Sequence, residues 1–111
     1  MVAVRASAAP AGFQALAPVG QVLGEPRFRW RPLASAWVYK VELTDAFGHP
    51  VARGWSGMSE LPLAWLRRDD GHPPELTVGD TYRWRVYAYV GPPTEEPTAT
   101  APEAEFLFLG P

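Results

Sequence analysis

TYRWRVYAYV, from Thr81 to Val90, is the stretch that decides the fold of this chain. Every second position is apolar or aromatic, in the order Tyr82, Trp84, Val86, Ala88 and Val90. The intervening positions hold Thr81, Arg83, Arg85, Tyr87 and Tyr89. Because successive side chains of a β-strand point to opposite faces of the sheet, this alternation predicts a strand with the first set against a core and the second set facing outward.

Six other segments are expected to form strands around it. The firmest are Glu25–Arg31 and Ala36–Thr44, which alternate in the same way. The turn DAFG, Asp45 to Gly48, is expected to close a hairpin after the second of these. The shorter expected strands are Phe13–Val19 at a sheet edge, Pro50–Trp55, Leu61–Leu63 and Glu103–Leu109. Gly91–Pro102 is expected to be a loop, because it is too rich in proline for sheet pairing.

Composition agrees with an all-β fold. The 111 residues include 13 Pro and 10 Gly, which separate short strands by turns, and the length suits one domain. We therefore expect an antiparallel sandwich of two sheets with six or seven strands, preceded over residues 1–17 by a flexible N-terminal segment or linker that can include a short edge strand. The expected core is Phe28, Trp30, Trp37, Tyr39, Val41, Leu43, Leu76, Tyr82, Trp84, Val86, Ala88, Phe106 and Phe108.

Charge and cysteine content narrow the function classes. The formal net charge is −2 with both signs mixed, which gives no electrostatic case for nucleic acid or an anionic membrane surface. Cysteine is absent, which excludes a disulfide scaffold and a thiolate metal site. Residues 1–14 lack the features of an export signal, and no stretch has the length of a membrane span, so membrane contact is expected only through an anchor outside this chain.

Catalytic motifs are weak, and we expect neither an enzyme nor a cofactor. Gly54 to Met58 resembles a nucleophile elbow around Ser56, but Met58 stands where that motif needs glycine. Asp69, Asp70 and His72 share one loop, yet their spacing fits neither a calcium nor a zinc motif, so a solvated turn is favoured over a metal site.

The outer face of the central sheet is the candidate interaction surface. If the strands are neighbours, one contiguous aromatic and apolar patch would comprise Val38, Lys40, Arg83, Arg85, Tyr87, Tyr89, Leu107 and Leu109. Such patches mark partner sites, and tyrosine and arginine are favoured at binding hot spots. A protein partner or a homodimer is expected here. The competing interpretation is that these side chains only stabilise the sheet through cross-strand pairs.

A carbohydrate-binding or glycosidase-associated module is the alternative function. Aromatic side chains on a β-sandwich can stack on sugar rings, and Trp55 and Trp65 are the tryptophans outside the expected core. Nucleic-acid stacking on Arg83, Arg85, Tyr87 and Tyr89 is disfavoured by the acidic balance of the chain.

Several of these residues carry a family resemblance. Pro26–Trp30, Ala36 with Tyr39–Leu43, Leu76–Gly79 and Tyr82–Val86 together resemble the fibronectin type III-like domains of bacterial extracytoplasmic proteins. The nearest version is the periplasmic C-terminal domain of anti-sigma-factor-type, membrane-anchored regulators. The resemblance implies a seven-stranded antiparallel sandwich, immunoglobulin-like or fibronectin type III-like, over residues 18–109, with sheets of three and four strands, no catalytic site and a location outside the cytoplasm. It also implies a tyrosine corner in which the Tyr82 hydroxyl bonds back to the preceding loop above Leu76.

The chain departs from that family in two places. Ser35 stands where the family usually has glycine in the turn after the first tryptophan strand, and Ala64–Glu75 is longer than its counterpart.

Overall fold

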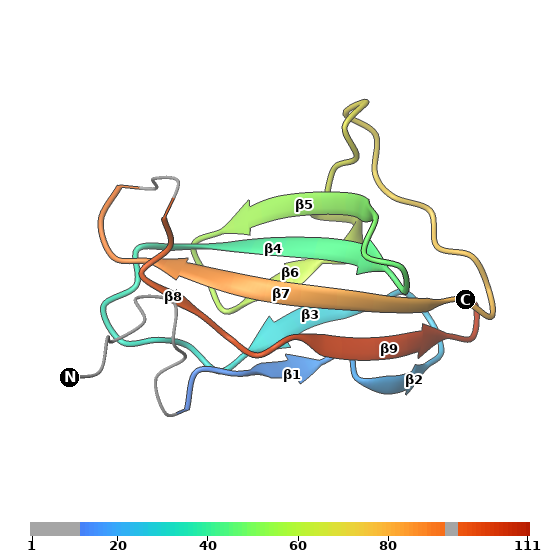
Figure 1. Cartoon of the computed structure of the whole chain (residues 1–111), viewed down its shortest axis with the longest axis horizontal. Coiled ribbons are helices and arrows are strands. Elements are labelled where there is room, and N and C mark those ends of the chain that lie inside the picture. Colours follow the sequence, from blue (N-terminus) through green and yellow to red (C-terminus); the bar gives the residue numbers. More distant parts are fainter. Residues whose placement is uncertain (1–11, 93–95) are drawn as a thin grey trace.

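The computed structural model describes residues 12–92 and 96–111 and shows a nearly all-β chain (Figure 1). Its strands are β1 (Ala15–Ala17), β2 (Gly20–Val22), β3 (Arg27–Trp30), β4 (Val38–Asp45), β5 (Pro50–Ser56), β6 (Glu60–Pro62), β7 (Thr81–Tyr89), β8 (Ala99–Thr100) and β9 (Ala104–Phe108). One turn of 3₁₀-helix, Leu63–Trp65, follows β6. The N-terminal part of the expected linker, residues 1–11, lies outside the described residues.

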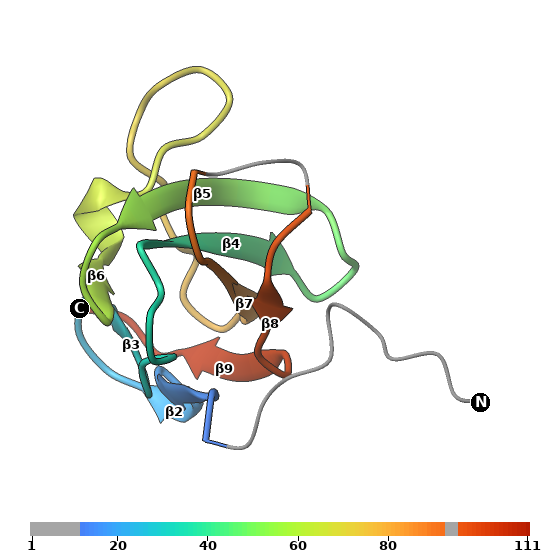
Figure 2. The ribbon, with the colours of Figure 1, turned by 90° about the vertical axis from the view of Figure 1, so that its left-hand side faces the viewer.

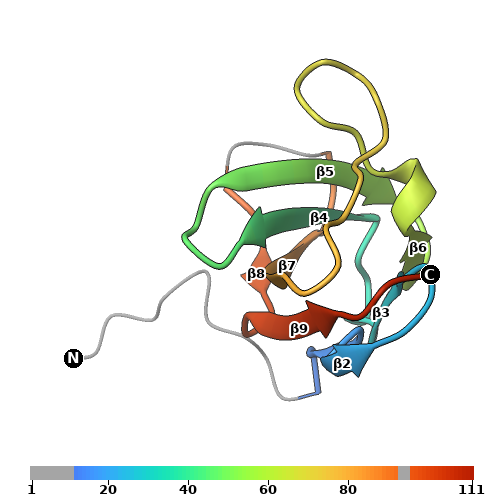
Figure 3. The same cartoon turned by 90° about the vertical axis from the view of Figure 1, so that its right-hand side faces the viewer.

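The strands form two sheets, which confirms the predicted all-β, two-sheet arrangement. The smaller sheet has the order β1-β3-β6, and the larger has the order β2-β9-β7-β4-β5, with β8 also pairing with β7. Seen along the strands, the two sheets face each other across one interior (Figures 2 and 3). The side chains that fill this interior come from the inward positions of both sheets.

The pairing of β4 with β7 is the centre of the larger sheet. It is antiparallel and runs without a break from Val38 opposite Tyr89 to Asp45 opposite Tyr82. The inward residues of β7, from Tyr82 to Ala88, are buried as their alternation predicts. A continuous register of this kind places every second residue of both strands on the same face.

Two strands arise where none was expected. β2 pairs in parallel with β9, so the larger sheet is not wholly antiparallel. β8 lies within Gly91–Pro102, the segment predicted to be unpaired because of its prolines. That prediction was wrong since no proline occupies positions 98–101, which leaves the N–H groups of Thr98 and Ala101 free to bond to the carbonyls of Ala88 and Val86.

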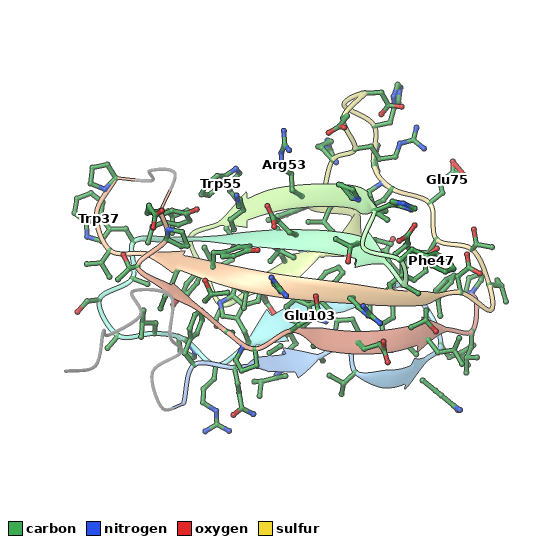
Figure 4. The ribbon with its side chains drawn as sticks, viewed as in Figure 1. Trp37, Phe47, Arg53, Trp55, Glu75 and Glu103 are labelled. Atoms are coloured by element: carbon green, nitrogen blue, oxygen red, sulfur yellow. The ribbon has the colours of Figure 1, made fainter. Side chains whose placement is uncertain are left out.

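The alternation of apolar residues predicts burial wrongly where β4 begins and β7 ends. Trp37 was expected in the core but is 65% exposed, because β4 begins only at Val38 and the indole lies beyond the end of the sheet (Figure 4). Val90 was expected inward but is exposed, because β7 ends at Tyr89. Tyr89 was expected to face outward into solvent but is 3% exposed.

Aromatic rings dominate the interior. The Phe28 ring lies edge-on to Trp84 at 5.0 Å between centroids, and Trp30 lies 6.5 Å from Trp84. The Trp84 Nε1–H donates a buried hydrogen bond of 2.9 Å to the carbonyl of Pro18, which ties the segment between β1 and β2 to the core. Edge-on rings and satisfied indole N–H groups are the favourable state of buried tryptophan.

The hydrogen bond expected of Tyr82 is present. Its hydroxyl accepts the backbone N–H of Thr77 at 2.8 Å, in the loop that precedes β7. Leu76 is only partly buried, and it packs against the core from that loop. This hydrogen bond attaches the loop before β7 to the start of that strand.

Replacing each buried tryptophan with phenylalanine should separate two contributions to stability. Trp84→Phe loses both ring volume and the bond to Pro18, whereas the Nε1 of Trp30 has no partner among residues 12–92 and 96–111. Trp84→Phe should therefore lower the free energy of unfolding by about 1–2 kcal/mol more than Trp30→Phe. Urea denaturation of the two variants measures this difference, and equal losses would contradict the role given to the hydrogen bond.

Candidate interaction surface

The eight residues predicted to form one outer patch lie on neighbouring strands but at different ends of the sheet. Val38 lies opposite Tyr89, and Lys40 lies opposite Tyr87, at the end where β4 begins. Leu107 lies opposite Thr81 at the other end of β7, and Leu109 follows the end of β9. The expected adjacency of β4, β7 and β9 is therefore present, but these side chains do not form a single apolar patch.

A charged row separates the two ends. Arg83 on β7 pairs with Glu105 on β9 at 3.2 Å, and Arg85 on β7 pairs at 3.3 Å with Glu103, the residue just before β9. Figure 4 shows Glu103 in front of the central strands. Exposed ion pairs of this kind contribute little to stability, so the row mainly keeps the middle of the face polar.

Lys40 lies between two aromatic rings near the start of β4. Its Nζ is 5.7 Å from the ring centroid of Trp55 and 5.3 Å from that of Tyr87, and it forms a 3.2 Å ion pair with Glu42. The Trp55 ring also lies 5.5 Å from that of Tyr89, which explains why Tyr89 is buried although it belongs to the outer face. Cation–π contacts and the ion pair hold Lys40 in one position.

Tyr87 extends this arrangement through its hydroxyl. The phenol donates a 2.8 Å hydrogen bond to the Glu42 carboxylate. Burial raises the pKa of Tyr87 above its usual value, and the adjacent Glu42 carboxylate raises it further. The phenol therefore stays protonated at neutral pH and remains a donor to Glu42.

Large apolar side chains are exposed around this group. We use the name aromatic end for Trp37, Lys40, Trp55, Tyr87 and Val90, of which Trp37 is bonded through its backbone N–H to the Tyr89 carbonyl. Trp55 is 47% exposed and Val90 is 46% exposed. Trp55 and Trp37 lie toward the same end of the molecule (Figure 4). The sequence suggested Trp55 as a sugar-stacking residue. Its position beside Lys40 could not be inferred from the sequence, because it depends on the register in which β5 pairs with β4.

Ser56 has a structural role in the turn between β5 and β6. It is buried, its hydroxyl lies 2.9 Å from the Glu60 carbonyl, and it accepts the N–H of Met58 at 3.0 Å. These bonds close the turn. The geometry gives no support to the nucleophile-elbow interpretation of Gly54–Met58, which would require a strand-to-helix turn.

Gly54 lets the segment after β6 pack against β5. An added Cβ would lie 2.9 Å from Leu66 Cδ2 and 3.3 Å from the Trp65 carbonyl. Gly54→Ala should therefore lower the free energy of unfolding by about 1–3 kcal/mol. Gly57→Ala is the matched control, because no atom lies within 4 Å of its Cβ position, and it should change stability by less than about 0.5 kcal/mol. Thermal melts of the pair would contradict this packing if both variants behaved alike.

The loop that holds Asp69, Asp70 and His72 is closed by Asp70. Its carboxylate accepts the backbone N–H of His72 at 3.0 Å and pairs with Arg68 at 2.8 Å. Among the residues that the structure describes, no three metal-ligating side chains come together. The arrangement is a hydrogen-bonded turn.

These contacts determine the pH at which the Asp70 carboxylate is protonated. The His72 N–H, and then the Arg68 guanidinium, lower the pKa of Asp70 from 3.8 to about 2. The stabilisation that the carboxylate gives the loop is therefore full above pH 3.8 and is lost as the pH falls toward 2. Arg68→Gln should raise this pKa without restoring 3.8, because the His72 N–H remains. Carboxyl NMR titration measures it, and an unchanged midpoint in the variant would exclude the contribution of Arg68.

A cleft lies beside the outer edge of β5. The backbones of Arg53 and Arg67 exchange hydrogen bonds of 3.0 and 2.9 Å, so residue 67 extends the sheet by one bridge. The adjoining cleft has a volume of about 490 Å³, and its lining includes Arg53, Arg67, Asp69 and Thr44. Trp65, the second candidate for sugar stacking, lies two residues before Arg67 and is 59% exposed.

Compared with known proteins, the chain matches no family model, no curated protein and no solved structure. None of the helical segments within residues 12–92 and 96–111 has the length and apolar character to cross a bilayer.

Proposed function

We propose that this chain is a non-enzymatic β-sandwich module that binds a protein partner through its aromatic end. The observation that carries the proposal is the exposure of Trp37, Trp55 and Val90 around the fixed side chains of Lys40 and Tyr87. Tryptophan and tyrosine are the residues most enriched at binding hot spots, and clustered exposed apolar side chains mark interaction sites. A rigid aromatic surface also loses little conformational entropy on binding.

We infer that the sandwich is of the fibronectin type III kind and serves outside the cytoplasm in a membrane-anchored bacterial protein. The inference is supported by the small sheet β1-β3-β6 facing the larger one, and by the hydrogen bond between Tyr82 and the loop before β7. The resemblance in sequence implies the same location. In this setting the module would act as an interaction domain or a spacer.

The first experiment tests whether the chain self-associates through the aromatic end. Light scattering across a concentration series should show a dimer that dissociates in Trp37→Ala. Phe47→Ala is the matched control, because Phe47 is equally an exposed aromatic residue but lies at the opposite end of the molecule (Figure 4). Both substitutions should change the free energy of unfolding by less than about 0.5 kcal/mol, since both side chains are exposed.

If the chain is a monomer at every concentration, the partner must be a different protein, and a second experiment looks for it. A photo-crosslinking residue at position 37, compared with one at position 47, then identifies whether a partner contacts the aromatic end in the cell. Crosslinking confined to position 37 supports the proposal. Equal or absent crosslinking at both positions would contradict it.

A further inference from the structure

Arg53 and Arg67 place two positive charges opposite each other at the edge of β5. Because their backbones exchange both hydrogen bonds, their side chains project to the same face. Like charges directly across a ladder destabilise it. No carboxylate pairs with either side chain within the part of the chain that the structure describes. The arrangement therefore leaves room for an external anion.

Each of the two guanidinium groups keeps a free edge that can bind a carboxylate. The Arg67 Nη1 donates to the carbonyls of Ala64 and Leu66, at 2.6 and 2.8 Å. Those bonds hold the group in place and leave its Nε and Nη2 without a partner in residues 12–92 and 96–111. This is the fork that binds a carboxylate through two parallel hydrogen bonds. Arg53 has no side-chain hydrogen bond in the same residues, so its fork is also free.

Two exposed indoles accompany this arginine pair. Trp55 follows Arg53 by two residues along β5, and both side chains point away from the sheet in Figure 4. The chain at Arg67 runs antiparallel to β5, so Trp65, two residues earlier, passes along the same edge as Trp55. The arginine pair therefore lies on the same strand edge as two exposed tryptophans.

The cleft next to the pair also carries oxygen acceptors. Its lining includes Asp69 and the hydroxyl-bearing Thr44, while the two other carboxylates are already paired, Asp70 with Arg68 and Glu42 with Lys40. Carboxylate and hydroxyl oxygens accept hydrogen bonds from sugar hydroxyls. The lining combines features that suit a sugar with those that suit an anion.

We propose that the β5 edge and this cleft form a binding site for an acidic polysaccharide built from uronic acids. The sugar carboxylates lie on the forks of Arg53 and Arg67, the sugar rings stack on Trp55 and Trp65, and the ring hydroxyls reach Asp69. This binding function is distinct from the protein docking proposed for the aromatic end, and the two sites have only Trp55 in common. No bond is made or broken.

Affinity electrophoresis of the 111-residue chain in gels containing polygalacturonate tests the proposal. Migration should be retarded by polygalacturonate and unaffected by dextran, a neutral glucan. Arg53→Gln with Arg67→Gln should weaken binding by at least about tenfold. Arg53→Gln alone should already weaken it, and this variant removes no side-chain hydrogen bond that the fold uses. Trp65→Ala should weaken it without affecting self-association.

The matched control removes the same charge from the other sheet. Arg29 on β3 and Arg31 just after it are exposed and have no carboxylate partner in the described residues, so Arg29→Gln with Arg31→Gln should leave retardation unchanged. Equal loss in the control, or equal retardation by poly-glutamate or DNA, would reduce the effect to general attraction of polyanions and overturn the proposal. Absence of retardation by polygalacturonate, alginate and hyaluronan would also overturn it, whatever Trp37→Ala shows for docking.

Discussion

The antiparallel register between β4 and β7 is the constraint on which the rest of the structure depends. It sets Val41 opposite Val86 and Leu43 opposite Trp84 in the core, and by the same step it sets Lys40 opposite Tyr87 on the outer face. A slip of one residue would exchange the two faces of a strand. The burial of the inner residues therefore determines which outer side chains meet, and the contacts of Lys40 follow from the packing of the core.

The regular strands could be predicted from the sequence because alternation extends over most of their length. All seven expected segments overlap an observed strand, although the bounds differ, as in β6, which begins at Glu60 rather than Leu61; Trp84 and Val41 are buried as predicted. β2 and β8 could not be predicted, since strands of three and two residues are too short to show a period. Trp37, Tyr89 and Val90 were placed wrongly because alternation says which face a residue belongs to but not where the sheet ends.

The candidate surfaces were harder to predict than the fold because each joins segments that are distant in sequence. The sequence singled out Tyr87, Tyr89 and Lys40, but not Trp55 as their neighbour, which follows from the pairing of β5 with β4. It also gave no sign that Arg85 and Glu103 would divide the outer face. The bridge between Arg53 and Arg67 depends on Gly54, whose missing side chain admits Leu66 against the strand.

The side chains of the outer face differ in whether the fold already holds them. Lys40, Glu42 and Tyr87 satisfy one another, so their conformational entropy is lost on folding and binding need not fix them again. Arg53 has no such partner among the described residues, and an anion that bound it would have to order its side chain as well. Groups that satisfy one another make a rigid platform, whereas an unpaired charge on the surface is available to a ligand. Lys40 and Tyr87 at the aromatic end have the first character and Arg53 at the β5 edge has the second, which is why we assign the two surfaces different kinds of partner.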